Sequence, residues 1–117
     1  GLIWRIRDRR TFLELRRSGT RARRGPVTVI HLAADPHAPA QPPRIAFAVP
    51  RKVGTAVVRN RIRRCVRGRL LQRVRDPHRG VAPGAYLVTV RPEAAGLDGA
   101  DVADLVDACL DRLEQRT

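Results

Sequence analysis

The sequence predicts a mixed α+β sandwich whose helices and strands follow one another in the order αββαβα. Three segments carry apolar residues at spacings of three and four, which is typical of amphipathic helices, and three short stretches are rich in apolar and β-branched residues. Loops rich in proline and glycine separate several of them. In this order we expect the helices to cover one face of a small sheet, whose other face can stay open.

The first helix is expected from Asp8, which can cap it, through Arg17. Phe12 and Leu15 share one side of this segment, and its other side is largely arginine. Gly19 follows at the place where a left-handed C-cap residue is wanted. The pattern therefore predicts a short helix with one apolar and one cationic side.

Two strands are expected next, at residues 27–32 and 44–50. The segment 33–43 between them contains four prolines, which argue against a helix or a strand and predict a loop. In the second strand the side chains alternate, so that Ile45, Phe47 and Val49 share one face and the small Ala46 and Ala48 share the other.

The second helix is the longest, beginning at Gly54 or Thr55 and ending at about Arg75. Its buried stripe is expected to comprise Val58, Ile62, Cys65, Val66 and Leu70. A third strand at 85–90 follows the loop 76–84, and its continuous apolar character predicts a central position in the sheet.

The last helix is expected after a cap at Asp98. Its inward positions are Val102, Leu105, Val106, Cys109, Leu110 and Leu113. Its acidic residues fall at the spacing of a solvent-facing side: Asp104, Asp107, Asp111 and Glu114.

Length and composition predict one domain spanning residues 1–117. An apolar content of 43% excludes a wholly disordered basic tail. No apolar run approaches the ~20 residues needed to cross a bilayer, so we expect a cytoplasmic protein without membrane contact. Cys65 and Cys109 have neither a disulfide-framework nor a metal-ligand spacing and are expected to be reduced core residues.

The net charge of +13 is divided very unevenly along the chain. Residues 1–79 carry a formal charge of +17, and residues 80–117 carry −4. A cationic surface built from the first two thirds of the chain predicts a polyanionic partner.

The segment 54–70 is the densest cationic stretch. Six arginines lie on about three helical turns: Arg59, Arg61, Arg63, Arg64, Arg67 and Arg69. No acidic residue occurs between Gly54 and Arg75, which excludes ion pairs within this helix. Like charges at i,i+4 repel one another until a polyanion such as phosphate neutralises them.

Helical geometry sorts these side chains by direction. At about 100° per residue, Asn60, Arg64 and Arg67 fall on the side of the helix opposite the apolar stripe, and Arg63 lies at the edge of that side. Asn60 is equally consistent with a role in fixing the preceding turn and with direct contact to nucleic acid.

Three other arginines of this helix point toward the apolar arc. Arg59 lies near the start of the helix and is expected to be anchored there. Arg69 and Arg73 lie near its far end, where their stems are expected to cover apolar surface while their charged ends reach water.

A second basic surface is expected from residues that are distant from this helix in sequence: Arg16, Arg17, Arg21, Arg23 and Arg24, together with Arg51 and Lys52. Two cationic surfaces can hold two strands or two molecules. Phe12 and Phe47 are expected in the core, with a stacking surface for unpaired bases as the alternative.

No catalytic constellation is predicted in the polypeptide. His31, His37 and His78 have no cysteine or carboxylate at a spacing that would make a metal site. The acidic residues of the last helix follow its solvent side, unlike the paired inward carboxylates of a two-metal nuclease. The chain itself is therefore expected to make or break no bond and to hold no metal alone.

Three segments resemble the protein subunit family of bacterial ribonuclease P. Residues 47–70, FAVPRKVGTAVVRNRIRRCVRGRL, are similar to that family's strand, basic turn and RNR helix. Residues 5–23 resemble its N-terminal helix and turn, and 86–97 its last strand with the following RP segment. The resemblance implies that the protein binds the catalytic RNA through Arg51, Lys52, Arg59, Asn60, Arg61, Arg63, Arg64 and Arg67.

The resemblance also implies a cleft between the first helix and the sheet that takes the single-stranded 5′ leader of precursor tRNA. The matching positions are Phe12, Arg16, Val27, Ile30 and Phe47. It further implies a left-handed βαβ crossover, against the usual right-handed rule, and cleavage carried out by the RNA subunit with Mg²⁺. Aromatic residues common in the family's cleft are replaced here, so leader binding is expected to rest more on charge than on stacking.

The expected partners are therefore the catalytic RNA and precursor tRNA, with no DNA. The alternative from a different class is a ribosomal or general structured-RNA-binding protein, whose affinity would not depend on a single-stranded 5′ extension. A protein-only nuclease is a third class, and the lack of paired inward carboxylates argues against it.

Overall fold

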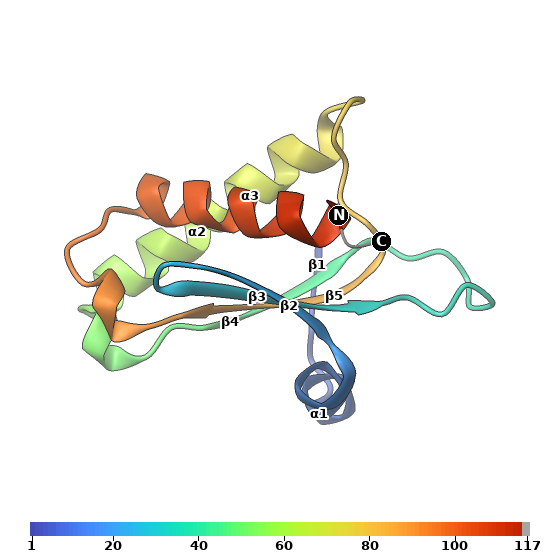
Figure 1. Cartoon of the computed structure of the whole chain (residues 1–117), viewed down its shortest axis with the longest axis horizontal. Coiled ribbons are helices and arrows are strands. Elements are labelled where there is room, and N and C mark those ends of the chain that lie inside the picture. The colour runs from blue at the N-terminus through green and yellow to red at the C-terminus, as the bar shows by residue number, and fades with distance from the viewer. Residues whose placement is uncertain (116–117) are drawn as a thin grey trace.

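A five-stranded mixed sheet lies at the centre of the molecule (Figure 1). Its strands are β1 (Trp4–Arg5), β2 (Thr20–Arg24), β3 (Val27–Ala33), β4 (Arg44–Ala48) and β5 (Gly84–Val90), in the spatial order β1-β4-β5-β3-β2. β4 is parallel to β1 and β5, whereas β3 is antiparallel to β5 and β2. The computed structural model describes residues 1–115 of the chain.

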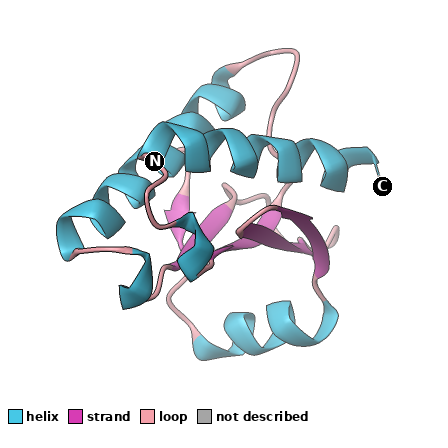
Figure 2. Cartoon of the chain, turned by 60° about the vertical axis from the view of Figure 1, so that its left-hand side comes forward, coloured by secondary structure: helices cyan, strands magenta, loops and turns pink. Residues whose placement is uncertain are grey.

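Helices lie on both faces of the sheet. α2 (Ala56–Arg75) and α3 (Gly99–Gln115) cover one face, and α1 (Arg9–Ser18) packs alone on the other (Figures 1 and 2). Two 3-10 helices, η1 (Arg51–Val53) and η2 (Pro92–Ala94), follow β4 and β5. The mixed α+β class is confirmed, but the placement of every helix on one face is wrong. Periodicity shows that α1 has an apolar side without showing which sheet face that side covers.

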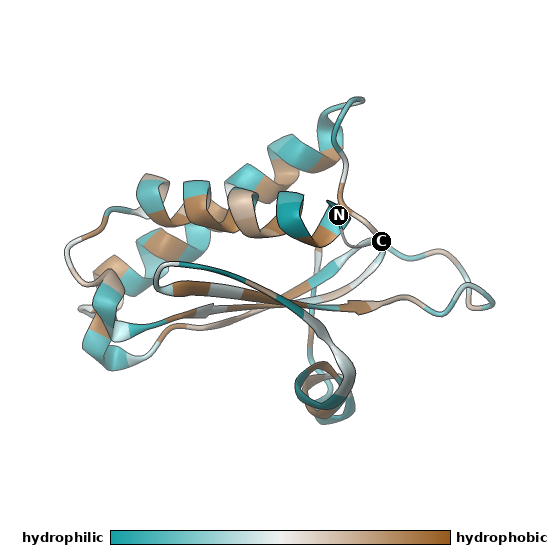
Figure 3. Cartoon of the chain, in the orientation of Figure 1, coloured by the Kyte–Doolittle hydropathy of each residue, from teal (hydrophilic) through white to brown (hydrophobic). Residues whose placement is uncertain are grey.

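Two hydrophobic clusters fill the two sides of the sheet because successive strand residues point to opposite faces. Figure 3 shows hydrophobic segments, in brown, on the strands and on the helices that cover them. The cluster under α2 and α3 includes Val27, Val29, Ile45, Ile62, Val66, Val88, Val106 and Cys109. The cluster under α1 consists of Ile6, Leu15, Ile30, Ala46, Ala85 and Leu87. The predicted alternation in β4 is confirmed, since Ile45, Phe47 and Val49 join the first cluster and Ala46 and Ala48 the second.

The predicted helices and strands are all present, with boundaries within two residues. The Asp8 carboxylate caps α1 by accepting a hydrogen bond from Thr11 N at 3.0 Å. The Thr55 hydroxyl caps α2 by accepting from Val58 N at 3.2 Å. At the start of α3, Asp98 accepts from Asp101 N at 2.9 Å. The capping residues of α1 and α3 were therefore predicted from sequence, and Thr55 is one of the two residues expected to begin α2.

Two edge strands were missed. β1 has only two residues, and β2 has the sequence TRARR, in which Ala22 alone is buried. β2 pairs with β3 through a turn at Gly25, whose φ of +55° suits glycine. An edge strand has no neighbouring strand on its outer edge and is exposed to solvent on one face, so it needs few apolar residues. Its sequence therefore lacks the apolar pattern by which strands are predicted.

Gly19 ends α1 in a different way from the one expected. Its φ and ψ are −68° and 148°, an extended conformation, so the prediction of a left-handed cap is wrong. Its N–H still donates to Leu15 O at 3.0 Å. A Cβ at this position would collide with the Ile30 side chain and the Leu15 carbonyl. Glycine is required because the chain passes close to β3.

α2 connects two strands that lie side by side. β4 and β5 are parallel neighbours, as a βαβ crossover requires, and α2 spans the connection (Figure 1). Among residues 1–115, no helix has the length and apolar character needed to cross a membrane.

Candidate nucleic-acid interface

The first half of α2 presents a cationic surface. Asn60, Arg61 and Arg64 are exposed, and Arg59, Arg63 and Arg67 are half-buried beside them. The Arg63 guanidinium donates to Asn60 Oδ1 at 2.9 Å. None of these arginines forms an ion pair with a carboxylate of residues 1–115. Their charge is therefore available to an external anion, and Asn60 orients one of them.

Arg67 lies on a flank of α2 rather than opposite its apolar stripe. Its guanidinium carbon is 5.7 Å from the centre of the Phe47 ring on β4, a cation–π contact. The prediction that Arg67 points away from the stripe is thus wrong, because the buried stripe of α2 is centred on Ile62, Val66 and Leu70 and places Arg67 next to the sheet. Phe47 correspondingly lies beneath α2.

Arg59 is anchored, as expected from its angle. The residue is half-buried, and its Nε atom is buried without a hydrogen-bond partner in residues 1–115. The stem therefore packs at the start of α2.

The expected second basic surface is divided between two places. Arg51 and Lys52 lie in η1, which packs against the start of α2, and both are exposed. Arg16 and Arg17 lie instead at the end of α1 on the other side of the sheet (Figure 1). Arg21 of β2 belongs with them, since it donates to Arg16 O at 3.3 Å. Arg51 and Lys52 thus extend the α2 surface.

One end of the sheet collects cations from three segments. β2 ends at Arg24, β5 is followed by the exposed Arg91, and β4 is followed by η1. Arg91 N donates to Pro26 O at 2.8 Å, which fixes this strand end beside the turn. Strands are about 4.8 Å apart, so β4 and β2 lie about 14 Å from each other. Arg91 is not among the site residues predicted from sequence, and the signal for it is its position directly after a central strand.

The sheet face under α1 is only partly covered. α1 buries the row Ala46, Leu87 and Ile30, which are neighbours across β4, β5 and β3. The next row on the same face is Ala48, Thr89, Thr28 and Arg23, and none of these four residues is buried. We call these four residues the open row. Its side chains are small, hydroxylated or cationic, and it ends beside the cationic strand ends.

The structure separates the residues proposed for the leader cleft. Phe12 and Arg16 lie on α1, half-buried and exposed respectively, and Ile30 lies beneath α1 with 4% exposure. Val27 is fully buried on the opposite face, toward α2 and α3, and Phe47 lies on that face under Arg67. Val27 and Phe47 therefore cannot line a cleft beside α1. The family resemblance assigns Val27 and Phe47 to the cleft, but it does not show which face of the sheet each of these strand residues occupies.

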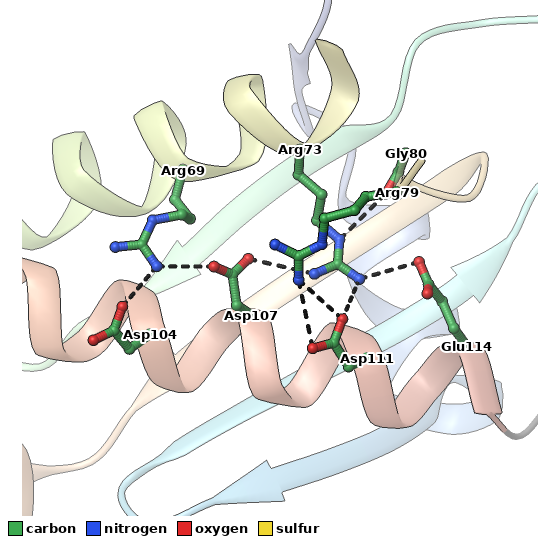
Figure 4. A network of polar contacts seen from close by, with 8 residues as sticks. All are labelled: Arg69, Arg73, Arg79, Gly80, Asp104, Asp107, Asp111 and Glu114. Carbon is green, nitrogen blue, oxygen red and sulfur yellow. Dashed lines mark hydrogen bonds and ion pairs between the residues drawn. The ribbon is translucent and has the colours of Figure 1, made fainter. Parts of the chain in front are cut away.

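The second half of α2 is tied to α3 by ion pairs (Figure 4). Arg69 contacts Asp104 at 2.7 Å and Asp107 at 2.8 Å. Arg73, whose side chain is 1% exposed, contacts Asp107 at 3.4 Å, Asp111 at 2.7 Å and Glu114 at 3.1 Å. The expectations that the Arg73 charge reaches water and that the acidic side of α3 faces only solvent are wrong. Sequence periodicity does not show which helix lies opposite.

The loop after α2 joins this network. Arg79 contacts Asp111 at 3.1 Å, and the Arg73 Nε donates to Gly80 O at 3.2 Å. Burial lowers the pKa of Arg73, but its hydrogen bonds with Asp111 and Glu114 outweigh that effect and raise the pKa above its ordinary value. For Asp111, burial raises the pKa, but Arg73 and Arg79 outweigh it and lower the pKa below its usual range. These groups remain charged at neutral pH.

His31 and Tyr86 have structural contacts with each other and with the backbone. His31 stacks on Tyr86 with ring centres 4.4 Å apart, and its Nε2 lies 3.0 Å from Pro83 O. The Tyr86 hydroxyl donates to Ala82 O at 2.6 Å, and burial raises the pKa of Tyr86 far above its ordinary value. Cys65 and Cys109 are free thiols, half-buried and buried. In residues 1–115, no group of three or more His, Cys, Asp or Glu side chains is placed to hold a metal ion.

Comparison with known proteins gives consistent matches over nearly the whole chain. The family described as ribonuclease P matches residues 3–114. The ribonuclease P protein component of Streptomyces avermitilis is 43% identical over 117 residues, covering 93% of this chain and 90% of the relative. That of Streptomyces bikiniensis is 44% identical with the same coverage.

Solved structures support the fold. The RNase P protein of Staphylococcus aureus superposes with a TM-score of 0.77 at 20% identity, covering 95% of each chain. That of Thermotoga maritima superposes with a TM-score of 0.71 at 23% identity, covering 92% of this chain and 96% of the other. The arrangement of three helices about a mixed sheet is therefore shared with these proteins.

Proposed function

Since the chain belongs to the ribonuclease P protein family, whose members are components of the endoribonuclease that processes the 5′ ends of tRNA, we propose that it binds both the catalytic RNA subunit and the 5′ leader of precursor tRNA. The polypeptide would supply binding and orientation, and the RNA subunit would carry out the cleavage. Mg²⁺ would be held through the RNA subunit.

The observation that supports RNA binding is the unpaired charge on the first half of α2. Five arginines there have no carboxylate partner in residues 1–115, and η1 adds Arg51 and Lys52 at the start of the helix. Arginines crowded on a few turns destabilise the helix slightly by mutual repulsion. Phosphates neutralise that repulsion, and their released counterions favour binding.

The open row is the surface that we propose for binding the leader strand. It is a stretch of sheet that α1 leaves uncovered, with the exposed Arg16 on α1, Arg23 at one end of the row and Arg91 at the adjacent strand end. Hydroxyl groups on Thr28 and Thr89 can bond phosphate or ribose. With Phe47 lying on the other face, we propose that this chain holds the leader mainly through charge and hydroxyl groups.

Reconstitution tests this proposal. A transcribed bacterial RNase P RNA is assayed for cleavage of precursor tRNA at low Mg²⁺, with and without the protein. We expect the protein to increase cleavage, and to increase it more for a substrate with a leader of several nucleotides than for one with a single leader nucleotide. No increase with either substrate would disprove the role in RNase P. An increase that is equal for both would disprove leader binding and favour a general structured-RNA-binding protein.

A further inference from the structure

The two halves of α2 differ in what their arginines contact. In the first half, Arg59, Arg61, Arg63, Arg64 and Arg67 have no ion pair among residues 1–115. In the second half, Arg69 and Arg73 form five ion pairs with four carboxylates of α3 (Figure 4). The boundary between the halves falls between Arg67 and Arg69, within a single helix.

We propose that RNA contact on α2 ends at Arg67. The acidic side of α3 sets this boundary because its carboxylates form ion pairs with Arg69 and Arg73 and repel phosphate. This inference rests on the proposed RNA binding by α2 and specifies how far along the helix that binding extends. It assigns a function in RNA positioning to carboxylates that do not themselves contact RNA.

The charge balance at the second half of α2 supports the boundary. The network contains three arginines, Arg69, Arg73 and Arg79, and four carboxylates, so its formal charge is −1. Arg73 is buried and cannot reach a phosphate. Asp104 has 69% of its side chain exposed, so its charge faces solvent beside Arg69. A phosphate approaching Arg69 therefore meets the exposed Asp104 carboxylate beside it.

The outward surface of α2 changes at the same place. Arg61 and Arg64 are followed on this side by Gly68 and Gln72, which are uncharged and exposed. A Cβ on Gly68 would meet no atom within 4 Å, so packing does not require glycine there. The next outward cation, Arg75, lies about 16 Å beyond Arg64 at 1.5 Å per residue. The continuous cationic surface therefore extends from Arg64 toward η1, and the RNA would extend in that direction.

Salt dependence of RNA binding distinguishes the two halves. The affinity of the full chain for a transcribed RNase P RNA is measured at several salt concentrations for Arg64→Gln, Arg69→Gln and Asp104→Asn. We expect Arg64→Gln to flatten the slope of log affinity against log salt by something under about one unit, because one phosphate contact is lost. Arg69→Gln should leave the slope unchanged.

Asp104→Asn gives the positive test. Asp104 is exposed and Arg69 keeps Asp107, so this variant retains the fold, which a circular dichroism melt would verify. Removing a repulsive charge within a Debye length of the RNA should tighten binding about two-fold or more at low salt. Unchanged or weaker binding by Asp104→Asn, or a slope flattened by Arg69→Gln as much as by Arg64→Gln, would overturn the boundary.

Photo-crosslinking provides a readout that does not depend on affinity. A benzophenone-bearing residue replaces either Val57 or Gln72, which are both exposed on α2 and about 22 Å apart. We expect crosslinks to the RNA from position 57 and none from position 72, and crosslinks from position 72 would refute the boundary. If Arg64→Gln leaves the slope unchanged and position 57 gives no crosslink, the proposed binding of RNA by α2 fails, which is a distinct result.

Discussion

The two faces of the sheet differ in how completely they are covered. Among the residues that the structure describes, nineteen buried ones form one cluster toward α2 and α3, and an ion-pair network joins the two helices at its edge. Toward α1, six buried residues form a smaller cluster, and the open row stays uncovered. Because stability grows with the apolar area removed from water, the α2/α3 face contributes most of it, and the α1 face keeps surface free for a ligand.

This difference also separates the two kinds of cationic surface. The arginines of α2 lie on a helix that is held firmly from beneath by the larger cluster. Arg16 lies on α1, which packs through fewer residues. A rigid surface suits a structured RNA of fixed shape, and a sheet face beside a lightly held helix suits a flexible single strand.

Truncating one buried side chain on each face is expected to have the largest effect. Ile62→Ala, in the larger cluster, should lower the free energy of unfolding by about 4 kcal/mol, and Leu15→Ala, beneath α1, by about 2 kcal/mol. The α1 cluster is smaller and bordered by the half-buried Phe12 and Leu32, so its cavity can collapse further. Urea unfolding measures both values.

The exposed Leu13 on α1 provides the control for this pair, because Leu13→Ala should change stability by less than about 0.5 kcal/mol. Equal losses for Ile62→Ala and Leu15→Ala would contradict the difference between the faces.

Removing the charge at the centre of the network tests its part in joining α2 to α3. Arg73→Met should cost roughly 3 kcal/mol, the lower end for loss of one partner of a buried pair, because Asp111 and Glu114 are half-exposed and can take up water. Urea unfolding again measures the loss. Arg75→Met, at the same end of α2 but exposed, should change stability by less than about 0.5 kcal/mol. Similar values for both would mean that the network adds no net stability.

The sequence was sufficient where local pattern decides the outcome. The apolar spacing of α2 and the caps at Asp8 and Asp98 depend on residues within one or two turns, and these predictions are confirmed. The alternation of Ile45 and Ala46 likewise follows from the strand itself. The face to which α1 packs depends on the path of the chain through Gly19, which no local pattern records.

The candidate site was predicted in part for the same reason. The cationic half of α2 is visible in the sequence because its arginines are consecutive along one helix. Val27 was placed in the leader cleft although it lies on the opposite face, because the resemblance did not settle its strand phase. The pairing of Arg73 with Asp111 and Glu114 joins residues 38 and 41 positions apart, so it depends on how α2 and α3 cross.

Replacing either of two glycines with alanine should change the stability of the protein, in opposite directions for the two positions. Gly19→Ala places a methyl group against Ile30 and the Leu15 carbonyl and should cost about 2 kcal/mol, as overpacking does. Gly68→Ala meets no atom, lies in the middle of α2, and should stabilise the protein by about 0.5–1 kcal/mol. Thermal melts of the two variants report the signs. A neutral Gly19→Ala would show that α1 can shift away from β3 at little cost.

Acidification should weaken the attachment of α1 to the sheet. Of the four predicted changes in stability, this one should be the smallest. Hydrogen bonds from the side chain and backbone of Thr11 lower the pKa of Asp8 below its ordinary value of 3.8, and Arg44 adds a smaller effect. A carboxylate with a lowered folded-state pKa stabilises the protein above the unfolded value and loses that contribution as the pH falls through the folded value. The wild type should therefore lose stability below about pH 4 partly through Asp8.

Asp8→Asn isolates this contribution, because asparagine caps a helix about as well as aspartate but does not titrate. The variant should unfold at a similar urea concentration to the wild type at pH 7 and should show a shallower loss between pH 5 and pH 3. The exposed ion pair with Arg44 adds little at neutral pH. Identical pH profiles for the two proteins would show that the cap of α1 does not depend on the charge of Asp8, and that the α1 face is held by its apolar contacts alone.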